Sequence, residues 1–223
     1  MTDAILDVRD LRVEIPLSRG TVHAVDGASF TVRPGEALGL VGESGSGKSM
    51  TLRAILGLLP SPGRVVSGEV EFEGQDLASA SQRRLRDVRG ARIGMIFQEP
   101  MTALNPVMRV IDQIAEAPMA HLGQSRSQAR STALDLMRKV GIPDPHRRAQ
   151  AYPHELSGGM RQRVMIAIAL SCEPKLILCD EPTTALDVTI QDQILKLLGA
   201  LRRDFGVSVV FVTHDLAVVA QTC

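Results

Sequence analysis

Apolar and polar residues alternate along the first part of the chain, over residues 5–32. The runs at residues 11–15 and 29–32 show this period of two, which is typical of a strand with one solvated face. A similar alternation returns over residues 68–76. Sheets with one solvated face are mostly antiparallel, so the pattern predicts an antiparallel β region near the start of the chain.

Continuous apolar runs predict a second kind of strand, one that is buried on both faces. They lie at residues 37–41, 176–179 and 207–213. Helical patterns follow the first two runs, at residues 49–59, which Pro60 and Pro62 end, and at residues 190–205. Buried strands that alternate with helices form a parallel sheet covered on both faces, so we expect an α/β fold.

The stretch between Pro100 and Pro153 has a different character. Strand patterns disappear and helical patterns dominate, at residues 110–116 and 128–140. The helical stretches are separated by Pro118, Pro143 and Pro145. We interpret this stretch as an all-helical insertion in the middle of the α/β core.

Composition and charge argue against a nucleic-acid partner. Of the 223 residues, 44% are hydrophobic and 22% are charged, which is ordinary for a folded globular protein. The 25 basic residues balance the 25 acidic ones, so no broad positive surface is expected to attract a nucleic acid. Aromatic residues make up only 3%, which disfavours a base-stacking platform for single strands.

Sequence features of membrane insertion and export are not found. No apolar run approaches the roughly 18–20 residues that span a bilayer, and residues 1–5 lack the pattern of a secretion signal. The three cysteines, Cys172, Cys179 and Cys223, form no C-x-x-C pair, which favours incidental thiols in a reducing compartment. We expect a protein of the cytosol or of the cytosolic side of a membrane.

A phosphate-binding motif follows the first buried run. The pattern G-x-x-x-x-G-K-[ST] lies between a predicted strand and a predicted helix, which is the context that its chemistry requires. Its residues are Gly42, Glu43, Ser44, Gly45, Ser46, Gly47, Lys48 and Ser49. Backbone N–H groups of such a loop point at phosphate oxygens, the lysine reaches the β- and γ-phosphates, and the hydroxyl binds Mg²⁺. The alternative is a flexible glycine turn without a ligand.

Two adjacent acids end the second buried run. Asp180 and Glu181 point in different directions on an extended chain, so we predict that Asp180 binds the metal ion while Glu181 polarises the attacking water. His214 ends the third run and could sense the γ-phosphate. The alternatives are that one acid caps the turn at Pro182 and that the histidine is structural.

The remaining motifs resemble those of ABC ATPases, in the order in which that family has them. Residues 156–162 are similar to the signature motif, Gln98 in residues 97–100 to the Q-loop, Ala185-Leu186-Asp187 to the D-loop, and His214 to the switch histidine. The resemblance implies that Gln98 contacts the metal ion or the attacking water. It also implies that two chains sandwich two ATP molecules, with Ser157 and Gly159 of one chain at the γ-phosphate held by the loop of the other. Gly158 and Asp187 are expected to bind nucleotide as well.

This resemblance covers residues 1–223 as one nucleotide-binding domain with a P-loop NTPase (RecA-like) core. Residues 1–98 would form the antiparallel region and the phosphate-loop part of the core, residues 99–155 the helical subdomain, and residues 156–223 the rest of the core. The chain ends at Cys223 inside a predicted helix, whereas members of the family continue further. We therefore expect a truncated end.

The residues of several motifs resemble those of the dipeptide, oligopeptide and nickel importers within this family. These motifs lie at residues 42–49, 97–106, 152–163 and 180–191. The resemblance implies ATP and Mg²⁺ as ligands, a second ATPase subunit, two membrane permeases and an extracytoplasmic solute-binding protein. It implies a peripheral position on the cytoplasmic face of the inner membrane, and it leaves the transported solute open.

One departure from the family concerns adenine. Members usually stack an aromatic residue on the base, but no aromatic residue precedes Phe30. Three residues are candidates for this contact, Arg19 and His23 by stacking and Ile15 by apolar contact.

Two rival functions use the same cassette. A DNA-acting ABC ATPase would carry a coiled-coil or zinc insertion in place of the helical stretch, and we interpret the nearby arginines as a solvated helix face. These are Arg83, Arg84, Arg86, Arg89 and Arg92. A subunit that binds ATP without hydrolysing it would lack Glu181 or His214, and both are present.

Overall fold

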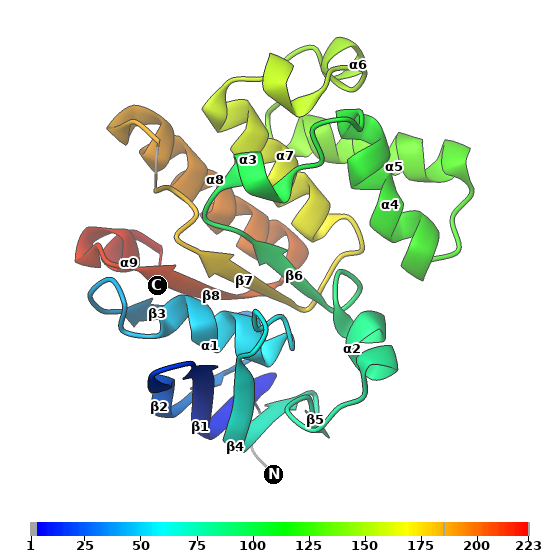
Figure 1. Cartoon of the computed structure of the whole chain (residues 1–223). Coiled ribbons are helices and arrows are strands. Elements are labelled where there is room, and N and C mark those ends of the chain that lie inside the picture. Colours follow the sequence, from blue (N-terminus) through cyan, green and yellow to red (C-terminus); the bar gives the residue numbers. More distant parts are fainter. Residues whose placement is uncertain (1–3, 185, 223) are drawn as a thin grey trace.

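The strands form two separate sheets in the computed structural model, which describes residues 4–184 and 186–222. One sheet is antiparallel, with strand order β2-β1-β4-β5, and the other is parallel, with order β3-β8-β7-β6. Figure 1 shows helix α1 (Lys48–Ile55) between them. The α/β fold with an antiparallel N-terminal region is confirmed.

The antiparallel sheet is built from β1 (Leu6–Leu17), β2 (Gly20–Val32), β4 (Arg64–Phe72) and β5 (Gln75–Asp76). The buried positions of β1 change phase along the strand, from Leu6 and Val8 to Leu11 and Val13. A shift in register against β2 separates the two pairs, and Asp10 within it has φ 44°. Such a bulge inserts one residue, so the same strand face stays on the core although the sequence period is interrupted.

The parallel sheet is formed by β3 (Ala37–Val41), β6 (Ile93–Ile96), β7 (Leu176–Asp180) and β8 (Ser208–Thr213). Along β7, Leu176 and Leu178 pack in the core that contains α1, while Ile177 and Cys179 pack in the core formed with the helices of the other face. Both faces of the central strands are therefore covered, as the continuous apolar runs predict.

The prediction of a fully buried strand at residues 37–41 is wrong. Every residue of β3 is at least partly accessible, and Val41 is 40% exposed. Among the described strands, β3 lies at the edge of the parallel sheet and pairs only with β8. It also borders an open hollow, which Gly39, Leu40 and Val41 line.

Helix α1 is shorter than the predicted stretch of residues 49–59. It ends at Ile55 because Gly57 adopts φ 59°, a left-handed conformation that terminates helices. The N–H of Gly57 donates to the carbonyl of Ala54, and the N–H of Leu58 donates to that of Arg53. The glycine, and not the later prolines, ends the helix.

Helices and no strands occupy the described chain between β6 and β7, and Figure 1 shows them on the side of the parallel sheet away from α1. They are α3 (Pro100–Ala103), α4 (Val110–His121), α5 (Arg126–Lys139), α6 (Pro145–Arg148), the 3-10 helix η1 (Pro153–Glu155) and α7 (Gly158–Leu170). Pro118 does not separate two helices, as predicted, but lies inside α4. The helix continues for one more turn because the N–H of Leu122 bonds to the carbonyl of Pro118.

The last described elements flank β8. Helix α8 (Val188–Phe205) precedes it and α9 (Leu216–Thr222) follows it. None of the helices in the described part of the chain is long and apolar enough to cross a membrane.

The arginines around α2 (Gln82–Val88) do not form one solvated face. Arg83, Arg84 and Arg86 are exposed on the helix, but Arg89 follows it and is partly buried. Its guanidinium donates to the carbonyl oxygens of Leu56 at 2.7 Å and Gly57 at 2.8 Å. The prediction is wrong for Arg89, which stabilises the carboxyl end of α1.

Candidate active site

The predicted site residues follow the strands of the parallel sheet. The glycine-rich loop at residues 42–49 follows β3, Gln98 follows β6, Asp180 and Glu181 end β7, and His214 follows β8. Because the strands are parallel, their carboxyl ends meet at the same edge, where ligands of open α/β sheets bind. Four segments that are distant in the sequence are thereby brought together.

Two glycines give the loop its curvature. Gly45 has φ 85° and Gly47 has φ 88°, which favours glycine at both positions. Gly47 is the N-cap of α1, and a Cβ there would lie 2.2 Å from the carbonyl oxygen of Ala24 in β2. The loop is therefore held against β2, with the amino end of α1 directed into it, an arrangement that attracts anions.

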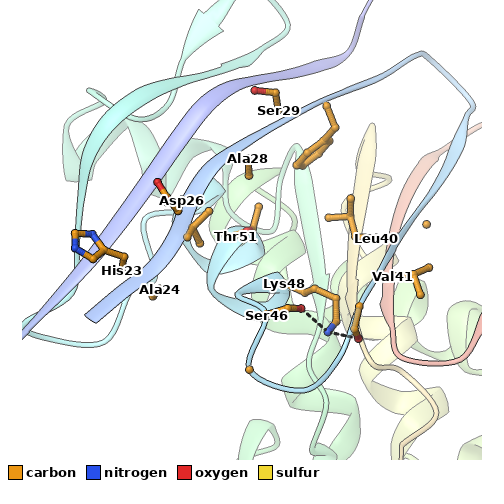
Figure 2. A pocket seen from close by; sticks show the side chains of 15 residues that line it. His23, Ala24, Asp26, Ala28, Ser29, Leu40, Val41, Ser46, Lys48 and Thr51 are labelled. Carbon is orange, nitrogen blue, oxygen red and sulfur yellow. Dashed lines mark hydrogen bonds between the residues drawn. The ribbon is translucent and has the colours of Figure 1, made fainter. Parts of the chain in front are cut away.

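Lys48 folds back onto its own loop. Its Nζ donates to the carbonyl oxygens of Gly42 and Glu43, each at 2.6 Å, and to Ser46 Oγ at 3.1 Å, and Figure 2 shows the side chain turned toward Ser46. An ammonium group held only by neutral oxygens can exchange them for the charged oxygens of a phosphate, which form stronger hydrogen bonds.

Ser49 and Asp180 form a pair of oxygen donors at the edge of the sheet. The Ser49 hydroxyl donates to Asp180 Oδ1 at 2.6 Å, and Asp180 is only 1% exposed. Burial raises the pKa of Asp180 above its ordinary value, against the hydrogen bond from Ser49 and the positive charge of Arg53. A hydroxyl beside a carboxylate is a donor set that suits Mg²⁺, and a cation there would offset the cost of burying the acid.

Glu181 has the left-handed conformation, with φ 45°, which a glutamate rarely adopts. Its N–H donates to the carbonyl of Val212 in β8. Its Oε2 accepts hydrogen bonds from Thr184 Oγ1 at 2.8 Å and from Gln98 Nε2 at 3.2 Å, and His214 Nδ1 lies 3.5 Å away. The two neighbouring acids thus face different partners, which fits separate roles.

A hollow of about 580 Å³ is lined by these groups except the buried Asp180. Loop residues lie on one side of it and Gln98, Glu181 and His214 on the other, with part of β2 completing the wall. A second hollow, of about 720 Å³, lies between β2, β3 and the loop (Figure 2). His23 lines both, whereas Ile15 and Arg19 are not in the described lining of either. Of the three candidates for the adenine contact, the geometry favours His23.

The other predicted nucleotide contacts lie elsewhere in the described structure. Ser157 is the N-cap of α7 and accepts the N–H of Met160, while Asp187 is the N-cap of α8 and accepts the N–H of Ile190 at 3.0 Å. Neither they nor Gly158 and Gly159 belong to the described lining of the 580 Å³ hollow. Ala185 lies outside the described residues. The chain alone does not bring these groups to its own phosphate loop.

Two residues were given no individual role from the sequence. Thr184 donates to the Glu181 carboxylate, and Gln162 is a buried polar residue on the neighbouring helix α7. A threonine three residues after an acid in a turn gives a weak signal for such a bond. Gln162 is the last residue of the motif at residues 156–162, but its burial depends on how α7 packs.

The fold and the loop define a phosphate-loop α/β protein with acids and a histidine at one sheet edge. Residues 25–184 match the family model described as ABC transporter. The chain therefore belongs to the ABC transporter family. It is similar, with 29% identity and a TM-score of 0.86, to a dimeric structure of the ATP-binding cassette MJ0796 in a post-hydrolysis state bound to ADP and Pi, covering 97% of this chain and 91% of that one.

Curated relatives are closer in sequence. The chain is 54% identical to a probable peptide ABC transporter ATP-binding protein, y4tR, of Sinorhizobium fredii, and 50% identical to the oligopeptide transport ATP-binding protein OppD of Salmonella typhimurium. Each match covers 99% of this chain and 66% of the relative. A dipeptide transport ATP-binding protein, DppD of Escherichia coli, is 52% identical over 98% of this chain and 67% of its own length. The chain thus spans about two thirds of these proteins.

Proposed function

We propose that this chain binds Mg-ATP at residues 42–49 and hydrolyses it. The observation that carries the proposal is the set of contacts at Glu181, whose carboxylate meets Gln98 and His214 in the hollow that the phosphate loop lines. This arrangement joins a phosphate site, a base and two polar groups within reach of one reacting centre.

The chemistry assigned to the residues is phosphoryl transfer to water. Glu181 orients the water and accepts its proton while the water oxygen bonds to the γ-phosphorus, and the bond from that phosphorus to the β–γ bridging oxygen breaks. ADP and inorganic phosphate result. Lys48 stabilises the charge on the phosphate oxygens, and His214 and Gln98 hold the water and the γ-phosphate in place.

Ser49 and Asp180 would hold Mg²⁺, with Gln98 as a further ligand. When bound, the ion supplies positive charge to the β- and γ-phosphates. The short hydrogen bond between Ser49 and Asp180 keeps both oxygens together before the ion binds.

Pairing with a second cassette completes the proposed site. Ser157, Gly158, Gly159 and Asp187 are not in the described lining of the hollow, so we assign them to the nucleotide held by a partner chain. The MJ0796 cassette, whose structure is described as dimeric and bound to ADP and Pi, supports this assignment. Residues 99–155 would then be a helical subdomain between the two parts of the core, residues 1–98 and 156–223.

The relatives support a role in peptide uptake. Their names describe peptide, oligopeptide and dipeptide transport, so we assign to this chain the energising of an importer for peptides or a related small solute such as nickel. The partners would be two membrane permeases and an extracytoplasmic solute-binding protein, and the position the cytoplasmic face of the inner membrane. The contacts of Glu181 and His214 favour this role over a non-hydrolysing scaffold, and the names of the relatives favour it over a DNA-acting ATPase.

The test is the variant Glu181→Gln, studied by ATP turnover and by light scattering. We expect ATP binding to persist, turnover to fall by about 10²–10⁴-fold, and ATP to convert monomers into dimers. Glu173→Gln is the matched control, because Glu173 also has a positive φ, 51°, but is exposed and lies outside the described hollow. Unchanged turnover in Glu181→Gln would exclude Glu181 as the base, and a wild-type chain that binds ATP as a dimer without cleaving it would exclude hydrolysis.

A further inference from the structure

A buried amide on α7 has no hydrogen-bond partner for its nitrogen. Gln162 is 1% exposed, and its Nε2 is one of the few buried side-chain atoms without a partner among the described residues. Buried polar groups are nearly always paired, and an exception calls for a bound water or a functional reason.

The same residue lines a small cavity between three functional segments. The cavity has a volume of about 120 Å³. Its walls are residues 98–101, then Gly158, Arg161 and Gln162 of α7, and finally Pro182, Thr184 and Leu186 beyond β7. A water molecule occupies about 30 Å³ of liquid, so the cavity has room for water beside the Gln162 side chain.

Two residues that donate hydrogen bonds to Glu181 line this cavity. The two groups that donate to Glu181 Oε2 are Gln98 Nε2 and Thr184 Oγ1, and both of these residues line the cavity. A molecule in the cavity would therefore contact both donor residues, Gln98 and Thr184, and the segment of α7 that also lines it.

The position of Gln162 on α7 links it to the amino end of that helix. Gly158 lines the cavity as well, four residues earlier, and residues four apart lie on the same face of a helix. A displacement of the amino end of α7 is therefore transmitted to the cavity, and so to the donors of Glu181.

We propose that Gln162 is a positioning residue for hydrolysis. Its amide anchors water in the cavity, and this water holds residues 98–101 and Thr184 where they donate to Glu181. The expected effect on kcat rests on the proposed ATP hydrolysis. The anchoring of residues 98–101 does not, because it is a property of the chain without nucleotide.

The test compares Gln162→Met with Gln113→Met. Gln113 is also a buried amide, 7% exposed, but its side chain is fully paired: it accepts the N–H of Asn105 and donates to the carbonyls of Asn105 and Met108. Methionine has a similar length and no donor, so both variants remove one amide at nearly constant volume. The measurements are the thermal midpoint, kcat and KM for ATP, and hydrogen exchange of the peptide that contains residues 98–101 without nucleotide.

For Gln162→Met we expect a nearly unchanged midpoint, since the amide and the water that it anchors are removed together. We expect kcat to fall about fivefold at constant KM, as for the loss of one hydrogen bond in the transition state, and exchange of residues 98–101 to become faster. Gln113→Met is expected to lower the midpoint and leave kcat and that exchange unchanged. In a Gln98→Ala background, Gln162→Met is expected to have little further effect on kcat, since both act on the same bond.

Wild-type kcat and wild-type exchange in Gln162→Met would overturn the inference while leaving the proposed function intact. A lower midpoint with unchanged exchange at residues 98–101 would also overturn it, because Gln162 would then be only structural. A wild-type chain without ATP turnover would refute the proposed function, and the exchange measurement would still decide whether Gln162 anchors the segment.

Discussion

Replacing Gly47 by alanine tests whether the phosphate loop depends on its contact with β2. Gly47 and Gly45 have nearly the same conformation, with φ 88° and 85°. They differ in their surroundings, because a Cβ at Gly47 would lie 2.2 Å from the carbonyl oxygen of Ala24, whereas one at Gly45 would meet nothing within 4 Å. Gly45→Ala is therefore a matched control that shares the backbone strain without the clash.

The two effects can be separated in magnitude. A left-handed conformation costs an alanine about 1–2 kcal/mol, and this term applies to both variants. A contact of 2.2 Å with a backbone atom cannot be relieved by a side-chain rotation, so β2 or the loop must move, which adds about 1–3 kcal/mol as in overpacked sites. We expect a free energy of unfolding lower by about 2–5 kcal/mol for Gly47→Ala and by about 1–2 kcal/mol for Gly45→Ala.

The assay is urea unfolding of both variants and the wild type without nucleotide, followed by circular dichroism. Stability is measured without ATP so that lost binding does not contribute. Equal losses of stability in the two variants would refute the reasoning, since the clash with Ala24 would then have no cost. A stable Gly47→Ala that still binds ATP would show that the loop is not held against β2.

Three further variants test other parts of the structure. Lys48→Ala should abolish tight Mg-ATP binding, measured by calorimetry, because the loop loses the ammonium group that three oxygens hold in place; unchanged affinity would contradict the site. Ser157→Arg should leave ATP binding by the monomer intact and block the ATP-dependent dimer in light scattering, and lost binding by the monomer would place Ser157 at its own nucleotide. Arg89→Met should lower the free energy of unfolding by about 1–2 kcal/mol, because the carbonyls of Leu56 and Gly57 lose their donor; an unchanged urea midpoint would show that water replaces it.

The sequence predicted the strands correctly where the hydrophobic pattern of a segment matches its burial in the fold. The runs at residues 176–179 and 207–213 are buried on both faces and form β7 and β8. The run at residues 37–41 has the same pattern but forms a half-exposed edge strand, because the order of strands in a sheet is not contained in the period of any one of them. Pro118 inside α4 failed as a boundary for a related reason, since the packing of the surrounding helix stabilises what propensity disfavours.

The candidate site also has features that the sequence predicts and features that it does not. The loop motif and the Asp180-Glu181 pair predicted which residues meet, because each lies at the end of a strand and the strands are parallel. No pattern in the sequence predicts the positive φ of Glu181, and Thr184 is only a weak signal for the hydrogen bond to its carboxylate. Both depend on how the turn after β7 fits against β8, and that fit is a property of the packed sheet.

The packing of α7 is consistent with the proposal that a second chain completes the site. Near the carboxyl end of this helix, a Cβ on Gly94 of β6 would lie 2.4 Å from the carbonyl oxygen of Ala169, and at its amino end a Cβ on Gly159 would lie 2.9 Å from Ile190 of α8. The helix is thus held closely at both ends, against the parallel sheet and against α8. Carrying Ser157 to its own phosphate loop would break both contacts, whereas a second chain can present the same helix end without breaking either. Close packing of α7 therefore favours a site shared between two chains, and the proposed role of Gln162 would couple the position of this helix end to Glu181.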